Sequence, residues 1–262
     1  MSAEHPNHGK LEEMFDLMME GQRPGDPDYH NNMGSRYRAR GELDNAIREY
    51  REAIRLRPDD AMFHCNLGIT CTQKGEYQEA LCAYEHALRL RPSDYHAHFS
   101  LGNLLRKLER NEDAIVAYQR AIEREPERVE AHCNLAACYW DARRWQDAAS
   151  HYGRALTLEP DMPLAALAHY RIGWHFLRQR SLEKAEAHLL EALRREPDEF
   201  MTNYTLAGLY FHRDAGEPPQ RELMLKAAHY ARKAVELDPS DVDAKGLLLR
   251  ASAELERTKP LE

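Results

Sequence analysis

Six prolines at a recurring interval constrain the fold of this chain more than any other feature. The first four are each 34 residues apart, and the next two follow after 37 and 42 residues. Self-similarity at a fixed period of about 20 to 50 residues predicts a repeat architecture rather than one or two globular domains. The prolines are Pro58, Pro92, Pro126, Pro160, Pro197 and Pro239.

The residues ahead of each proline predict a pair of helices. In the second unit, Leu67 and Cys71 lie four residues apart on one expected helix, and Ala80, Tyr84 and Ala87 share a face of the next. The proline stops the second helix because it lacks a backbone N–H and its ring clashes with the preceding turn. One such hairpin cannot bury both of its faces, so neighbours are expected to stack into a solenoid with a groove on its inner face.

This pattern resembles the tetratricopeptide repeat over about residues 27–239, as in Leu101-Gly102 followed by Ala114, Tyr118 and Ala121. The resemblance implies an all-α fold, a right-handed superhelical solenoid of about six helix-turn-helix repeats with capping helices at both ends. The expected segments are an N-terminal tail and cap helix (1–26), six repeats (27–60, 61–94, 95–128, 129–162, 166–199 and 200–240), and a C-terminal cap helix and tail (241–262).

Three segments outside the regular pattern have their own predictions. Apolar residues at helical spacing between Leu11 and Met18 predict a cap helix, and the alternative is a Met-rich segment that occupies the groove or grips a partner. A breaker cluster at 214–219 predicts a longer loop in the sixth repeat. Apolar residues at helical spacing between Leu248 and Leu255 predict a helix that covers the last hairpin.

Composition excludes several classes of protein. The 36 basic and 44 acidic residues leave a net charge of -8, which lacks the basic footprint of a nucleic-acid binder. The longest uncharged, mostly apolar stretch, 162–170, is too short to insert across a membrane, and the N-terminus does not read as a secretion signal. The five cysteines contain no Cys-x-x-Cys pair, so neither a zinc site nor a disulfide framework is indicated. A reducing, cytoplasmic location is expected.

Asparagine recurs one residue before the apolar position of the first helix, as Asn32, Asn66 and Asn134. An amide donates to a peptide carbonyl and accepts from a peptide N–H at once, so an asparagine ladder would hold an extended chain without reading its sequence. These repeats resemble the tetratricopeptide region of O-linked N-acetylglucosamine transferases, where such a ladder binds substrate backbone. The alternative is that the asparagines tie neighbouring first helices together. Arg171 and Thr205 replace asparagine in the fifth and sixth repeats.

The geometry that the resemblance implies divides the groove wall into a polar, partly basic early half and an aromatic later half. Aromatic side chains give large contact area at low entropic cost and often form binding hot spots. The alternative for the later half is cover by the C-terminal helix or by another copy of the chain. The expected groove residues are Asn31, Asn32, Arg38, Asn66, Asn103, Arg106, Asn134, Trp140, Tyr170, Trp174, Tyr204 and Phe211.

Histidine occupies one equivalent position in five successive repeats. Adjacent first helices of stacked hairpins lie about 9–10 Å apart, whereas each nitrogen on a zinc ion must come within about 2.1 Å of it. Packing at the helix interface is therefore the favoured interpretation over a metal ladder. The histidines are His30, His64, His98, His132 and His169.

The sequence favours an adaptor that binds a peptide segment of a partner protein in its groove, and it predicts no enzyme, cofactor or metal. None of the common nucleotide, phosphate-loop, metalloprotease or serine-hydrolase patterns is present. The residue pattern of modules that clamp a chaperone's C-terminal carboxylate fits poorly. Two alternatives are a self-assembling structural subunit, which makes the chain a possible homo-oligomer, and the recognition component of an enzyme whose catalytic chain is separate.

Overall fold

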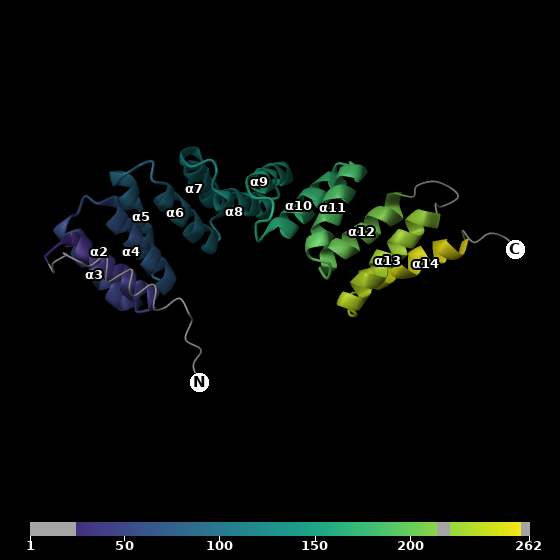
Figure 1. Ribbon diagram of the computed structural model, residues 1–262, viewed down its shortest axis with the longest axis horizontal. Coiled ribbons are helices and arrows are strands. Elements are labelled where there is room, and N and C mark those ends of the chain that lie inside the picture. The colour runs from purple at the N-terminus through teal and green to yellow at the C-terminus, as the bar shows by residue number, and fades with distance from the viewer. Residues whose placement is uncertain (1–24, 214–220, 258–262) are drawn as a thin grey trace, which may run out of the picture. The chain divides into compact units, whose positions relative to one another are not determined.

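The computed structural model describes residues 25–213 and 221–257, and within these ranges all regular structure is helical (Figure 1). The all-α fold predicted from the periodicity is confirmed. The chain divides into two compact units, an N-terminal unit that ends at Glu127 and a C-terminal unit that begins at Arg128. Each unit is described by itself.

Each unit is built from helical hairpins in chain order. The N-terminal unit contains α2 (Pro27–Ala39), α3 (Leu43–Leu56), α4 (Ala61–Lys74), α5 (Tyr77–Leu90), α6 (Tyr95–Lys107) and α7 (Asn111–Arg124). The C-terminal unit contains α8 (Val129–Asp141), α9 (Trp145–Leu158), α10 (Ala165–Arg178), α11 (Leu182–Arg195), α12 (Phe200–Arg213), α13 (Arg221–Leu237) and α14 (Val242–Arg257). The closest packing is within the pairs α2/α3, α4/α5, α6/α7, α8/α9, α10/α11 and α12/α13.

Local chemistry sets the ends of these helices. The side chains of Asp26, Asp60 and Asp94 each accept a hydrogen bond from a backbone N–H in the first turn of α2, α4 and α6, respectively. At the other end, the second helix of each hairpin stops two residues before the repeat's proline, as α5 does at Leu90 before Pro92. The residue before a proline is driven out of the helical region, so the 34-residue proline spacing sets the helix boundaries.

Glycine allows the two helices of a hairpin to approach closely. A Cβ placed on Gly68 in α4 would lie 2.7 Å from the ring of Tyr84 in α5. The Tyr84 side chain is 1% exposed and fills the space beside the bare glycine backbone. The same pairing joins Gly102 to Tyr118 at the same distance, so the buried ring against a glycine is a repeated core element of the N-terminal unit.

The turns inside the hairpins contain residues in the left-handed conformation. Gly75 has a φ of +91°, and Glu109, Arg143 and Arg180 have φ values of +59°, +58° and +58°. A Cβ disfavours this region, although the smaller φ values lie near the left-handed minimum that non-glycine residues reach. Position 75, where φ is larger, therefore has the stricter need for glycine.

Alanine is expected to have opposite effects at two glycines. Gly75→Ala should lower the free energy of unfolding by about 1 kcal/mol, because the new Cβ is strained at positive φ. Gly153→Ala in α9 should raise it by about 0.5–1 kcal/mol, because alanine favours the helix and a Cβ there meets nothing within 4 Å. Urea unfolding followed by circular dichroism measures both. A loss of stability at both positions would contradict the backbone explanation.

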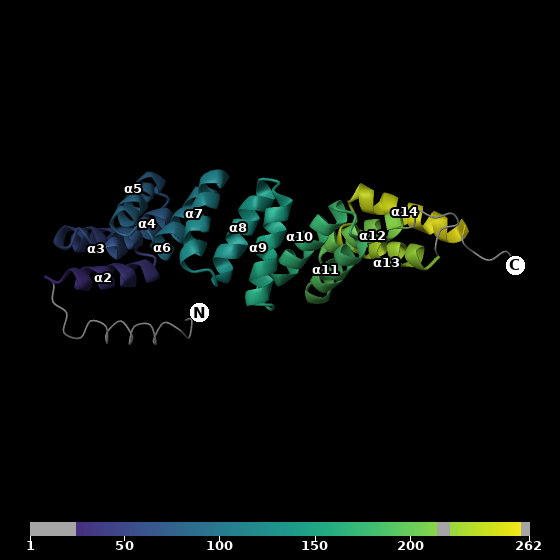
Figure 2. The same cartoon turned by 90° about the horizontal axis from the view of Figure 1, so that it is seen from above.

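The last helix of the C-terminal unit packs on the final hairpin. α14 contacts α12 and α13, and Figures 1 and 2 show the three helices side by side. Its apolar face buries Leu247 and Ala251 and places Leu248 and Leu255 against the same core. The predicted N-terminal cap helix and the predicted loop at 214–219 lie outside the described residues.

The five repeated histidines contact either the second helix of their own hairpin or the turn that precedes it. His30 lies 2.7 Å from a carboxylate oxygen of Glu49, and His64 lies 2.9 Å from the Pro58 carbonyl oxygen. His98 makes the same contact with Pro92, while in the next two repeats a histidine faces a second histidine, His132 with His151 and His169 with His188. These contacts fit the packing interpretation.

The paired histidines predict acid sensitivity. Burial and then the neighbouring His132 lower the pKa of His151, and burial is the main cause that lowers the pKa of His169 and His188. The unfolded chain therefore takes up protons first, so their contribution to stability is present above about pH 6.5 and is lost as the pH falls through the lower folded pKa. The Tm should fall between about pH 7.5 and about pH 5, and less in His151→Gln/His188→Gln than in the exposed control His229→Gln. An equal fall of Tm in the two variants would show that the paired histidines do not cause the acid sensitivity.

The cysteines are unpaired, and most of them are buried in the helical core. All five cysteines are free, and burial raises the pKa of Cys65 and Cys71 to about 12 and that of Cys133 to about 11. These thiols are therefore protonated near neutral pH.

Among the helices that the structure describes, none combines the length and apolar character of a membrane span.

Candidate functional site

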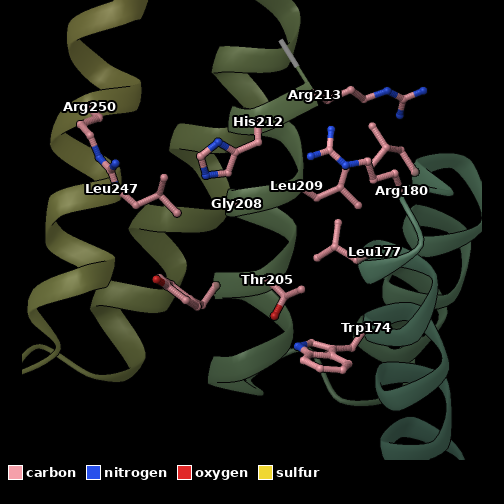
Figure 3. Close-up of a pocket in the computed structure, with 12 residues that line it drawn as sticks. Trp174, Leu177, Arg180, Thr205, Gly208, Leu209, His212, Arg213, Leu247 and Arg250 are labelled. Atoms are coloured by element: carbon pink, nitrogen blue, oxygen red, sulfur yellow. The ribbon is translucent and has the colours of Figure 1, made fainter. Parts of the chain in front are cut away.

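The C-terminal unit contains an open cavity of about 650 Å³. Three helices supply most of its wall: α10, α12 and α14, with α12 between the other two (Figure 3). A volume of this size lies in the range of ligand pockets, which take about 300–1,000 Å³. Its lining residues are Trp174, Leu177, Arg180, Leu182, Tyr204, Thr205, Gly208, Leu209, His212, Arg213, Leu247 and Arg250.

Helical spacing brings these side chains to one surface. On α12, Thr205, Gly208 and His212 follow one another at intervals of three and four residues, so they share one face of the helix. On α10 the same spacing joins Trp174 to Leu177, and both face α12 in Figure 3. The helical spacing on α10 and on α12 therefore brings these residues together on the cavity wall.

Gly208 leaves the wall of α12 open. A Cβ added at Gly208 would meet no atom within 4 Å, although the residue lies in the middle of a helix and lines the cavity. This glycine differs from Gly68 and Gly173, where an added Cβ would meet a buried side chain of the second helix. Packing within the hairpin does not require a glycine at position 208, so its effect is to keep space free in the cavity.

Among the described residues that line the cavity, every charged side chain is positive, because three of them are arginines and none is acidic. Arg213 is neutralised, because its guanidinium pairs with Glu186 at 2.5 Å and with Glu183 at 3.2 Å. Burial opposes the charge on Glu186, but hydrogen bonds from Tyr210 and Arg213 outweigh it and lower the pKa of that carboxyl. The remaining two arginines are Arg180 and Arg250.

A cluster of three tryptophans adjoins the cavity. Trp140, Trp145 and Trp174 come from α8, α9 and α10, and their ring centroids lie 5.0–5.2 Å apart in edge-on pairs. The Arg171 guanidinium lies 4.9 Å from the centroid of Trp140, and that of Arg178 lies 5.0 Å from the centroid of Trp174. The cluster fixes the Trp174 ring, which is the member that also lines the cavity.

The structure brings together part of the aromatic set predicted from the sequence. Trp140 and Trp174 meet in the cluster, and Trp174 and Tyr204 line one cavity. Tyr170 is half-buried, while Phe211 packs in the core below the Arg250 guanidinium, 5.4 Å from its ring centroid. Asn134, on α8, is half-buried and lies outside the cavity lining.

The predicted groove residues of the N-terminal unit differ in their burial and in the hydrogen bonds that they form within the unit. The Asn66 amide donates to the Asn31 side-chain oxygen at 2.9 Å, which joins α4 to α2. Asn103 accepts a hydrogen bond from the Tyr118 hydroxyl at 2.7 Å, within the hairpin α6/α7. Asn32 and Arg38 are half-buried and Arg106 is exposed. A smaller cavity of this unit, about 410 Å³ and lined by residues including His98 and Arg120, contains none of these candidates.

One group of potential metal ligands occurs in the part of the chain that the structure describes. Cys71, Glu76 and Glu79 bring their ligand atoms within 4.8 Å of one another. Burial raises the pKa of the Cys71 thiol to about 12, and the carboxylates pair with Lys74 and Arg51, respectively. Ion pairing beside a buried thiol explains this group.

Several residues of the site were missed by sequence reasoning. Trp145 lies on a second helix, and the groove was expected on first helices only, yet its ring reaches the first-helix tryptophans. Arg180 stands in a turn, and Leu247 and Arg250 lie on the helix expected only to cover the array. Gly208 carried one available signal, because glycine inside a helix without a packing role is unfavourable and points to another use.

The chain matches protein families of one kind. The family described as TPR repeat matches residues 34–71, and the family described as Tetratricopeptide repeat matches residues 73–126, 99–163 and 139–200. Among curated proteins, none matches the chain.

Solved structures of helical repeat proteins resemble the chain over most of its length. PilF of Pseudomonas aeruginosa is 18% identical with a TM-score of 0.63, covering 86% of this chain and 97% of its own. The C-terminal part of a TPR repeat-containing protein from Cytophaga hutchinsonii is 15% identical with a TM-score of 0.69, covering 92% and 95%. YrrB, described as a TPR protein with an unusual peptide-binding site, is 26% identical with a TM-score of 0.59, covering 72% and 95%.

Proposed function

The chain belongs to the tetratricopeptide repeat family, and we propose that it is a non-enzymatic adaptor whose C-terminal unit binds a peptide segment of a partner protein. The fold of this family serves protein–protein interaction in general, and YrrB, one of the similar structures, is described by its peptide-binding site. The family alone does not select a surface, because one scaffold hosts many partners. The choice of surface rests on the residues of this chain.

The cavity lined by α10, α12 and α14 is the observation that carries the proposal. It combines apolar side chains of Trp174, Leu177 and Leu209 with hydrogen-bonding groups of Thr205 and His212. Such a mixture suits a peptide, whose side chains need apolar cover while its backbone needs polar partners. The tryptophan ring is held by its cluster before any ligand arrives, so little side-chain entropy is lost on binding.

A selection from a displayed library of random peptides tests the proposal. The intact chain is the bait, and each recovered peptide is then titrated against the wild type and against Gly208→Leu, whose added side chain would occupy the part of the cavity beside α12. We expect peptides with micromolar or tighter affinity, all competing for one site and all weakened by Gly208→Leu. Failure to recover any peptide, or peptides that bind both proteins equally, would overturn the assignment of the cavity.

The N-terminal unit is proposed only as a secondary contact for the bound chain. The bond between Asn66 and Asn31 favours a role for these asparagines in joining first helices. The narrower similarity to the repeats of O-linked N-acetylglucosamine transferases therefore stays a prediction. Asn66→Ala is expected to weaken a selected peptide much less than Gly208→Leu does.

Self-assembly is the main alternative for the aromatic half of the groove. Sedimentation velocity of the intact chain distinguishes peptide binding from self-assembly. A peptide adaptor stays monomeric at high concentration, whereas a structural subunit associates. An association that selected peptides reverse would assign the cavity to a second copy of this chain.

A further inference from the structure

The cavity of the C-terminal unit contains two arginines that have no carboxylate partner among the described residues. Among the residues that the structure describes, neither Arg180 nor Arg250 forms an ion pair. The Arg250 Nε hydrogen is directed to the Gly246 carbonyl of its own helix at 3.4 Å, which leaves the terminal guanidinium nitrogens available. Figure 3 shows the Arg180 side chain extending toward α12 and the Arg250 side chain lying along α14, on the other side of α12.

These two arginines give the cavity a positive charge in a protein that is acidic as a whole. The net charge of the protein is -8, and many of its arginines pair with a carboxylate three residues away, such as Arg144 with Asp147 and Arg194 with Glu191. Arg213 in the same cavity is itself held by Glu186 and Glu183. The positive charge of the cavity is therefore local, and both guanidinium groups are exposed, so the carboxylates of a bound segment can reach them.

The apolar part of the wall lies between the two arginines. Leu209 and Leu247 are buried, with exposed fractions of 2% and 3%, and Leu177 beside them is half-buried. An aliphatic side chain that enters beside Gly208 would bury its surface mainly against Leu177, and at its edge against the small exposed parts of Leu209 and Leu247. Guanidinium groups bind carboxylates through paired hydrogen bonds that an amide or a lysine does not reproduce.

Resting on the proposed function, we infer that the cavity recognises an acidic segment in which aspartate or glutamate residues flank an aliphatic residue. The aliphatic side chain fills the space left by Gly208, and the flanking carboxylates pair with Arg180 and Arg250. Opposite charge also speeds the encounter with a segment of this kind and disfavours basic ones.

Three sets of short fluorescein-labelled peptides test this inference by anisotropy titration. All share a central leucine, which is flanked by aspartate and glutamate, by the isosteric asparagine and glutamine, or by lysine and arginine. We expect the acidic set to bind at least about tenfold more tightly than the amide set, with an affinity that falls as salt is added. The basic set should not bind.

Matched variants separate this inference from the proposed function. Arg180→Gln/Arg250→Gln should weaken the acidic peptides by about tenfold, whereas Arg154→Gln/Arg232→Gln, which removes the same charge from exposed sites outside the cavity, should not. Equal binding of the acidic and amide sets, or no effect of the cavity variant, would overturn the acidic preference while a loss in Gly208→Leu would still support the peptide site. Absence of binding by all three sets would overturn both.

Discussion

Replacing Tyr84 by alanine is expected to lower the free energy of unfolding by about 3–5 kcal/mol, the range for deleting a buried aromatic ring. The ring is 1% exposed and lies against the bare backbone of Gly68, so neither helix of the hairpin can close the space that it leaves. Because a repeat array is stabilised by contacts between neighbours, the loss should spread beyond its own hairpin. Urea unfolding followed by circular dichroism measures the change.

Tyr84→Phe provides the matched control. It keeps the ring and removes only the hydroxyl, which lies 3.3 Å from the Thr72 hydroxyl. Its cost should be no more than about 1 kcal/mol, the usual net worth of one neutral hydrogen bond. If alanine and phenylalanine destabilise equally, packing of the ring against Gly68 is not what holds the hairpin.

Gly208→Leu is expected to lower peptide affinity by at least about a hundredfold, close to 3 kcal/mol of binding free energy. The added side chain projects into open cavity, where nothing lies within 4 Å of a Cβ, and so takes the volume that a ligand needs. The same substitution should leave the folded state as stable or raise its stability by up to about 1 kcal/mol, since leucine is the better helix former. Opposite effects on binding and stability exclude misfolding as the cause of a lost affinity.

Gly153→Leu is the control for that variant. Gly153 lies in α9 of the same unit, outside the cavity, and a Cβ there also meets nothing within 4 Å. It should share the gain in helix stability and leave affinity unchanged. Equal loss of affinity in the two variants would mean that Gly208 has no special place in the binding site.

The fold could be predicted from the sequence because its signals are local and repeated. The proline spacing sets where second helices end, and the apolar spacing of Ala80, Tyr84 and Ala87 identifies a face that is buried in the structure. Each signal acts within one hairpin, and the period repeats it along the chain.

The site could be predicted only in part because it depends on contacts between hairpins. Trp174 and Tyr204 were identified from their places on first helices, and both line the cavity. The periodicity could not show that Trp145 reaches across from a second helix, or that Asn66 bonds to Asn31 rather than facing open solvent. Those outcomes depend on side-chain lengths and directions in three dimensions, which a repeat pattern leaves undetermined.

Leucine methyl spectra of the intact chain show whether a peptide binds at the cavity of the C-terminal unit. A selected peptide is added to protein labelled at leucine methyl groups, and the shifts of cavity and core leucines are compared. We expect saturable shifts at Leu177, Leu209 and Leu247, which line the cavity, with little change at Leu135, which is buried in α8 and outside the cavity lining. Shifts confined to leucines outside the cavity lining would contradict it.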